Sequence, residues 1–201
     1  MIRRAIIAAA AVAALTFSAT AMGGPSLDPR VGQQLRAGGV VLVFRHAVTD
    51  QSKQDETPVV LSDCTTQRNL SAQGRADART IGRQVRRLKL RIGTVLASPF
   101  CRTLETARLA FGRATATRTL LNTIVTTHDA RWRRQIAGVR RLLGSKPAAG
   151  TVTVLVTHGS VVGDATALTL EEGEALVFRP LGRSRFRLTG RILPAEWARV
   201  R

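Results

Sequence analysis

A run of apolar, mostly β-branched residues that ends in an arginine–histidine pair constrains the fold more than any other feature of this chain. The run covers residues 40–44, follows a glycine pair and leads directly into Arg45 and His46. Such a run is typical of a strand buried on both faces at the centre of an α/β sheet. Ligands bind such sheets outside the carboxyl ends of the strands. A cation and an imidazole at that place suit an anion together with a nucleophile or a proton carrier.

A second run of the same kind lies far along the chain. Residues 152–156 are again apolar apart from one threonine, and they lead into Thr157, His158 and Gly159. The chain has three histidines, and two of them follow strands that the pattern predicts to be buried. We therefore expect both imidazoles at the same edge of one sheet.

The remaining pattern alternates strands and helices. We expect helices over residues 26–37, 71–88, 103–111, 129–143 and 161–168, and strands over 40–44, 92–97, 152–157, 175–179 and 186–192, with a short edge strand within 117–125. Residues 47–67 lack periodicity and form a long loop, which inside a compact domain is usually functional. The alternation predicts an α/β fold, a three-layer α/β/α sandwich with a mostly parallel central sheet.

The amino-terminal segment is typical of a secretory signal peptide. Arg3 and Arg4 precede an apolar stretch over residues 5–17, and Ala19-Thr20-Ala21 forms a small-x-small cleavage site. We expect residues 1–21 to be removed and residues 22–201 to form a single domain that is periplasmic or secreted. A retained anchor is the alternative. No later stretch is long and apolar enough for a transmembrane helix, so we expect no stable membrane insertion after cleavage.

Export gives the two cysteines a meaning. Cys64 and Cys101 are the two cysteines of the chain, and an even number of cysteines in an oxidising compartment favours a disulfide. Such a bond would join the long loop to the segment after the 92–97 strand. Two independent thiols are the alternative.

The net charge favours anionic partners. It is +18, and loss of the two arginines in the signal peptide leaves +16. Phosphate esters, anionic head groups and nucleic acid all suit such a charge. Nucleic acid is disfavoured by the export signal and by the scarcity of aromatic residues, because no stacking platform is present. The oligomeric state is left open.

Several short motifs, in order, resemble the histidine phosphatase superfamily, which includes the cofactor-dependent phosphoglycerate mutases and many phosphatases. The motifs are Arg45-His46-Ala47, Asn69-Leu70-Ser71 with Gly74, Ser98-Pro99-Phe100-Cys101-Arg102 with Glu105-Thr106-Ala107, Thr157-His158-Gly159, and Glu172-Gly173-Glu174. The resemblance covers roughly residues 40–180 and implies a phosphoglycerate mutase-like fold.

The resemblance also implies roles for single residues. His46 would be the nucleophile that forms a phosphohistidine. The phosphoryl oxygens would be bound by a group of surrounding side chains: Arg45, Arg102, His158 and Asn69. Glu172 and Glu174 would border the substrate pocket, and Arg68 is interpreted as a solvated neighbour. No metal or other cofactor is implied, because the arginines supply the positive charge.

The general acid of the family has no obvious equivalent. Thr123 stands where the mutase branch has a glutamate, and Gly159 stands where the acid-phosphatase branch has an aspartate. The candidate replacements are Asp50, Asp55, Glu56 and Asp129. We take Asp50 first because it is nearest to His46 in sequence. Lack of an acid would cost about 10²–10⁴-fold on poor leaving groups.

The leading functional hypothesis is an exported phosphomonoesterase that acts through a phosphohistidine on a small phosphorylated substrate, such as an envelope sugar phosphate. The alternative is a catalytically weak or inactive pocket that binds a phosphorylated ligand. A metal site built from the two histidines and two cysteines is disfavoured, because the spacing matches no ligand motif and two arginines would repel a cation.

Overall fold

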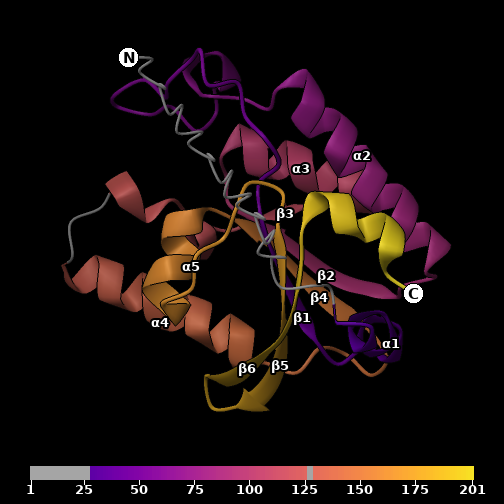
Figure 1. The fold of residues 1–201 in the computed structure, drawn as a ribbon. Coiled ribbons are helices and arrows are strands. Elements are labelled where there is room, and N and C mark those ends of the chain that lie inside the picture. The colour runs from indigo at the N-terminus through magenta and orange to yellow at the C-terminus, as the bar shows by residue number, and fades with distance from the viewer. Residues whose placement is uncertain (1–27, 126–128) are drawn as a thin grey trace, which may run out of the picture.

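A central sheet lies between two layers of helices in the computed structural model, which describes residues 28–125 and 129–201 (Figure 1). Over these residues the sheet has the strand order β3-β2-β4-β1-β5-β6. The strands are β1 (Val41–Arg45), β2 (Ile92–Ala97), β3 (Thr115–Ala116), β4 (Val152–Thr157), β5 (Ala175–Gly182) and β6 (Arg185–Ile192). The α-helices are α1 (Arg30–Ala37), α2 (Ala72–Arg87), α3 (Cys101–Phe111), α4 (Ala130–Gly144) and α5 (Gly159–Thr166). Short 3-10 turns cover Cys64–Thr66, Arg118–Leu120, Thr123–Val125 and Pro194–Arg199.

Strand β1 is buried on both faces, as its composition predicts. Leu42 and Phe44 pack in one core with residues of α1, α2 and α3. Val41 and Val43 point to the other face and pack with residues of α4 and α5. The predicted three-layer sandwich is therefore confirmed. The sheet is mostly parallel, because β3, β2, β4 and β1 run in one direction, and β5 is the strand that runs antiparallel to both of its neighbours, β1 and β6.

The pairing of β1 with β4 brings the two histidine motifs together. Arg45 lies opposite Thr157 in the parallel register, and the His46 backbone N–H donates to the Thr157 carbonyl at 3.0 Å. His46 and His158 therefore follow neighbouring strands at the same edge of the sheet. Two runs of sequence more than a hundred residues apart form one site for this reason.

The predicted edge strand within residues 117–125 is wrong. The edge strand β3 occupies Thr115–Ala116, and the chain then turns through two 3-10 segments. Thr117 begins the first turn, because its side chain accepts a bond from the Thr119 N–H at 3.3 Å. The turns matter for the site, because the Leu120 side chain is buried while the next residues approach the end of β4.

The predicted signal peptide lies outside the described residues. Within the described part of the chain, none of the helices has the length and apolar character needed to cross a membrane.

Candidate active site

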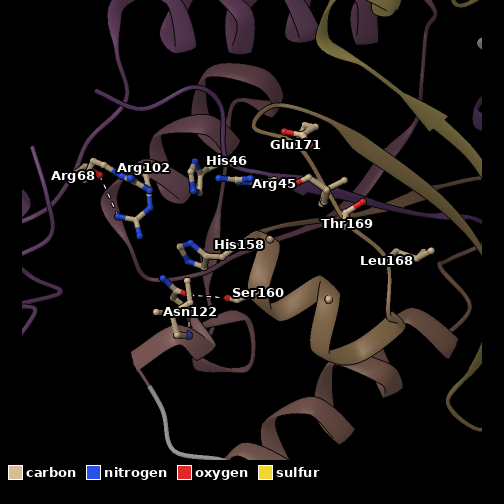
Figure 2. Close-up of a pocket in the computed structure, with 14 residues that line it drawn as sticks. Arg45, His46, Arg68, Arg102, Asn122, His158, Ser160, Leu168, Thr169 and Glu171 are labelled. Atoms are coloured by element: carbon tan, nitrogen blue, oxygen red, sulfur yellow. Dashed lines mark hydrogen bonds between the residues drawn. The ribbon is translucent and has the colours of Figure 1, made fainter. Parts of the chain in front are cut away.

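A pocket of about 400 Å³ opens at the carboxyl ends of β1 and β4 (Figure 2). Its lining is rich in cations and imidazoles. The lining residues are Arg45, His46, Arg68, Arg102, Asn122, Ile124, His158, Gly159, Ser160, Gly163, Leu168, Thr169, Leu170 and Glu171. Four of the predicted site residues, Arg45, His46, Arg102 and His158, are among them.

His46 is held as a neutral imidazole in one orientation. Its ring is 2 % exposed, and Nδ1–H donates to the Ala47 carbonyl at 2.9 Å. Burial is the main reason that the pKa of His46 falls from 6.5 to about 3, and the charges of Arg102, Arg45 and Arg68 lower it further. With its proton on Nδ1, the ring keeps a lone pair on Nε2. An unprotonated nitrogen is what a nucleophile needs.

The Ala47 carbonyl that fixes this tautomer is itself held in place. The Ala47 N–H donates to the Thr106 hydroxyl at 3.0 Å, and that hydroxyl donates to the Arg102 carbonyl at 2.7 Å. The backbone after His46 also approaches the start of α2 closely, because a Cβ on Gly74 would lie 2.0 Å from the Val48 carbonyl oxygen. The glycine is therefore needed for the position of the nucleophile loop.

His158 lies beside His46 and is oriented by a hydroxyl. The two ring centroids are 5.5 Å apart, and the His158 Nε2 is 2.9 Å from the Ser98 Oγ. Burial first, then the charges of His46 and Arg102, hold the pKa of His158 well below its ordinary value. If Ser98 donates to Nε2, the proton of the neutral ring sits on Nδ1, where it can donate to a phosphate oxygen.

Arg102 is a fully buried cation that Asp55 holds in place. The guanidinium donates to both carboxylate oxygens of Asp55, at 2.9 and 3.1 Å, and also to the Arg68 carbonyl at 3.1 Å. It lies 4.3 Å above the ring centroid of Phe100. Burial lowers the pKa of Arg102, and the bonds to Asp55 oppose this effect. A guanidinium with such partners stays charged and rigid.

Arg68 is a third arginine of the pocket that the sequence-based interpretation missed. It lines the cavity instead of pointing into solvent, and it donates to Gln51 at 3.1 Å (Figure 2). Its backbone N–H donates to Asp55 at 2.8 Å, so the same carboxylate positions both Arg68 and Arg102. Only its place beside Asn69 in the motif could have indicated a role.

Four buried nitrogens of pocket residues lack a hydrogen-bond partner within the described part of the chain. They are Nε of Arg45, Arg68 and Arg102, and Nδ1 of His158. Buried donors without partners are costly in proteins, so their concentration around one cavity needs an explanation. An oxyanion bound in the pocket would bring acceptor oxygens to a lining that is rich in such donors. The lining is therefore suited to an anion.

The predicted disulfide joins the long loop to the start of α3. Cys64 bonds to Cys101, the residue before Arg102, across 37 residues of sequence. The Gln67 side chain also accepts a hydrogen bond from the Cys101 backbone N–H at 2.9 Å. The loop that carries Asp55 and Arg68 is thus tied to the helix that carries Arg102.

Asn69 and Asp50 are among the predicted site residues that do not line the pocket. The Asn69 amide donates to the carbonyls of Cys64 and Gln67, at 2.6 and 3.0 Å, so it holds the loop instead of facing the anion site. Asp50 is exposed, and bonds from the Ser52 hydroxyl and N–H lower the pKa of its carboxyl group. Asp50 is therefore a poor candidate for an acid that must hold a proton.

Glu172 and Glu174 are the glutamates predicted to border the pocket, but the glutamate that lines it is Glu171. Glu172 accepts from the Thr49 hydroxyl at 2.8 Å and from Arg45 at 3.4 Å, and lies 3.9 Å from the His46 Nδ1. Glu174 is buried, accepts from the Glu171 N–H and pairs with Arg191 at 3.3 Å. The side chain that lines the pocket is that of Glu171. Glu172 thus supports the pocket from behind Arg45, and Glu174 shapes the turn.

The segment that resembles the acid-bearing stretch of the family contributes an amide. Asn122 lines the pocket, and Thr123 does not. The other proposed acids also lie elsewhere: Asp129 begins α4 by accepting from the N–H groups of residues 131 and 132, and Glu56 is exposed on the loop. Asp55 is bound to Arg102.

A sheet of this order, with two imidazoles and three arginines around one pocket, is the arrangement that the resemblance to the histidine phosphatases implies. The family model described as "Histidine phosphatase superfamily (branch 1)" matches residues 41–120, which include His46 and Arg102. The predicted resemblance to that superfamily is confirmed over these residues.

Solved structures share the fold at low sequence identity. The protein histidine phosphatase SixA, complexed with tungstate, has 16 % identity and a TM-score of 0.55 over 78 % of this chain and 98 % of that chain. An Entamoeba histolytica phosphoserine phosphatase in complex with 3-phosphoglyceric acid has 15 % identity and a TM-score of 0.52, over 76 % and 95 %. A mycobacterial glucosyl-3-phosphoglycerate phosphatase complexed with VO3 has 16 % identity and a TM-score of 0.52, over 76 % and 98 %. No curated protein matches the chain.

Proposed function

We propose that this protein is a phosphomonoesterase that hydrolyses small phosphate esters through a phosphohistidine on His46. The observation that carries the proposal is the neutral His46 ring with its proton fixed on Nδ1, in a pocket lined by three arginines. The arginines hold a phosphate group, and the free Nε2 lone pair is the nucleophile. Phosphoryl transfer asks a protein mainly for positioning and charge stabilisation, and this pocket offers both.

The reaction proceeds in two displacements. The lone pair of the His46 Nε2 forms a bond to phosphorus, the bond from phosphorus to the ester oxygen breaks, and the electron pair leaves with that oxygen. Water then attacks the phosphohistidine, the P–N bond breaks, and Nε2 recovers its lone pair. Water supplies one hydrogen to the phosphate and one to the alcohol, so the net reaction consumes one water for each ester.

The surrounding side chains stabilise the charge on the transferring group. Arg45, Arg68 and Arg102 line the pocket and have buried Nε–H groups without a hydrogen-bond partner in the described part of the chain, and His158 adds a neutral donor. Glu172, 3.9 Å from the His46 Nδ1, opposes the positive charge that the ring acquires when it is phosphorylated. None of these roles requires a metal ion.

Two of the structural neighbours are a phosphoserine phosphatase and a glucosyl-3-phosphoglycerate phosphatase, and this supports a similar substrate size here. The signal peptide predicted over residues 1–21 supports export to the periplasm or beyond. A phosphorylated sugar of the cell envelope fits that location and the net charge of +16 that remains after loss of Arg3 and Arg4.

A second candidate is a weak or inactive pocket that binds a phosphorylated ligand. The observation that favours it is the lack of a buried carboxyl group among the described residues that line the pocket. The binder would hold phosphate without turning it over.

The test is a phosphatase assay of the mature protein and its His46→Ala variant with p-nitrophenyl phosphate. The phosphatase should release p-nitrophenol, form an acid-labile, base-stable phosphoenzyme and lose both properties in the variant. Binding of vanadate without any turnover by the wild type would favour the binder. Turnover that persists in His46→Ala would refute the phosphohistidine mechanism.

A further inference from the structure

Asn122 is the one amide side chain among the described residues that line the pocket. It belongs to the turn after β3, its side chain is 8 % exposed, and it lines the pocket together with His158 and Ser160. In Figure 2 it lies on the far side of His158 from His46. In-line displacement sends the leaving group to the side of phosphorus opposite the nucleophile. Asn122 is therefore on the side where the leaving group departs.

The orientation of the Asn122 amide is fixed by two donors. Its Oδ1 accepts from the Ser160 hydroxyl at 2.7 Å and from the Ile124 backbone N–H at 3.2 Å. The Ile124 N–H can only donate, so exchanging the oxygen and nitrogen of the amide would set two donors against each other. The Nδ2 group is consequently the free end. Within the described part of the chain its two hydrogens have no protein acceptor.

A carboxylic acid does not stand on that side of the pocket. Among the described lining residues Glu171 has the only carboxyl group, and it is exposed. In Figure 2 it lies near Arg45 and His46, on the opposite side from Asn122. Carboxyl groups that act as general acids typically lie in apolar pockets, whereas Glu171 is exposed.

We propose that the Asn122 amide binds the leaving-group atom as a neutral hydrogen-bond donor, and that the site therefore selects substrates whose leaving group departs as a stabilised anion. This inference rests on the proposed function and adds its substrate class. When the bond from phosphorus to the leaving group breaks, the electron pair stays on the departing oxygen. The amide N–H stabilises that charge but keeps its proton. Solvent water protonates the product after release.

The favoured substrates are aryl and acyl phosphates. Phenolate and carboxylate ions are stable enough to leave without a proton, and a hydrogen bond is sufficient for them. A simple alkoxide is not, and general-acid catalysis contributes about 10²–10⁴-fold in such cases. Alkyl phosphates should therefore bind to the arginines but turn over slowly.

The experiment compares p-nitrophenyl phosphate with glycerol 2-phosphate in wild type, Asn122→Asp, Asn122→Ala and Glu171→Gln. Asn122→Asp is the informative variant, because aspartate keeps the oxygen that accepts from Ser160 and Ile124 and replaces the amide nitrogen with a protonatable oxygen. Thermal melting and vanadate affinity are measured for each variant to establish that the fold and the anion pocket persist.

The wild type should prefer the aryl ester by about 10³-fold in kcat/KM. Asn122→Asp should raise kcat on glycerol 2-phosphate about 10-fold or more at acid pH, with a fall toward neutral pH as the new carboxyl group ionises. Asn122→Ala should lower kcat on the aryl ester about 10-fold with little change in KM. Glu171→Gln should leave the ratio between the two substrates unchanged.

Two outcomes overturn the inference and leave the proposed function intact. One is wild-type turnover of glycerol 2-phosphate within about 10-fold of the aryl ester that is lost in Glu171→Gln, which would make Glu171 the acid. The other is aryl turnover that Asn122→Ala does not change. Failure of the proposed function looks different, because the wild type would then be inert toward both esters.

Discussion

The carboxylate of Asp55 accepts two hydrogen bonds from the guanidinium of Arg102, although the two residues are 47 positions apart in the sequence. Arg102 is 1 % exposed, and Asp55 stands on the long loop that the sequence leaves without regular structure. The loop is thus part of the anion site. A bidentate pair fixes the plane of the guanidinium as well as its position.

Replacing Asp55 with asparagine should misplace Arg102. Asparagine offers one acceptor oxygen where two are needed, and its amide group opposes the guanidinium donors. We expect kcat/KM for an aryl phosphate to fall about 10-fold, and stability to fall by about 1–3 kcal/mol because a buried cation loses its partner. Asp63→Asn is the matched control, since Asp63 is on the same loop and its carboxylate accepts hydrogen bonds from the N–H and hydroxyl of Thr65 instead of from an arginine. Equal kinetic losses in both variants would contradict a specific role for Asp55.

Replacing Arg68 with alanine should weaken phosphate binding without disturbing Arg102. The backbone N–H and carbonyl of residue 68, which bond to Asp55 and Arg102, remain in the variant. The guanidinium alone is removed, so KM for the phosphate ester should rise about 10-fold with a smaller change in kcat. Arg79→Ala, an exposed arginine of α2, serves as the control for loss of one positive charge. If both variants raise KM alike, the effect is one of general charge.

The histidines and the central strands could be predicted because their signals are local and strong. An apolar run has to be buried, and the residue after it has to reach the edge of the sheet, so His46 and His158 met as expected. Arg68 and Asn122 carry no such signal. Their neighbours lack periodicity, and their directions depend on bonds to Asp55 and Ser160 that only the tertiary structure creates.

The glutamates of residues 171–174 illustrate the same limit. The sequence places all of these glutamates near the end of the sheet, but it does not determine the direction in which each side chain points. Glu172 accepts a hydrogen bond from the Thr49 hydroxyl. Glu174 accepts one from the Glu171 N–H and forms an ion pair with Arg191. Glu171 is therefore the glutamate that lines the pocket. Asn69 lies outside the pocket lining for a related reason, because its amide donates to the loop carbonyls of Cys64 and Gln67.

Removal of the disulfide should loosen the loop and weaken the site together. The bond closes 37 residues of chain, and loop-closure entropy gives a stabilisation of about 3–4 kcal/mol for such a length. The double variant Cys64→Ser/Cys101→Ser should melt several degrees lower, and its vanadate affinity should fall because Asp55 and Arg68 are less restrained. Dithiothreitol should reproduce both effects in the wild type and change nothing in the double variant. Unchanged vanadate affinity would show that the other loop contacts are sufficient.

The two buried imidazoles should make the protein less stable in weak acid. The pKa of His46 is about 3 in the folded state against 6.5 for an unperturbed histidine, and the pKa of His158 is also lowered. Between these values the unfolded chain binds protons that the folded chain excludes, so stability is complete above about pH 6.5 and falls as the pH drops toward 3. At pH 5 the loss from His46 is on the order of 2 kcal/mol, at about 1.4 kcal/mol for each unit of pH below 6.5. The carboxyl groups of Asp50 and Asp63 have lowered pKa values and contribute only below about pH 4, so they do not obscure this range.

Denaturant unfolding at pH 7.5, 6 and 5 should show the decline in the wild type and a shallower one in His46→Gln, where one of the two titrating rings is absent. Parallel curves for the two proteins would mean that His46 is accessible to protons in the folded state, and that its role as a permanently neutral nucleophile is incorrect.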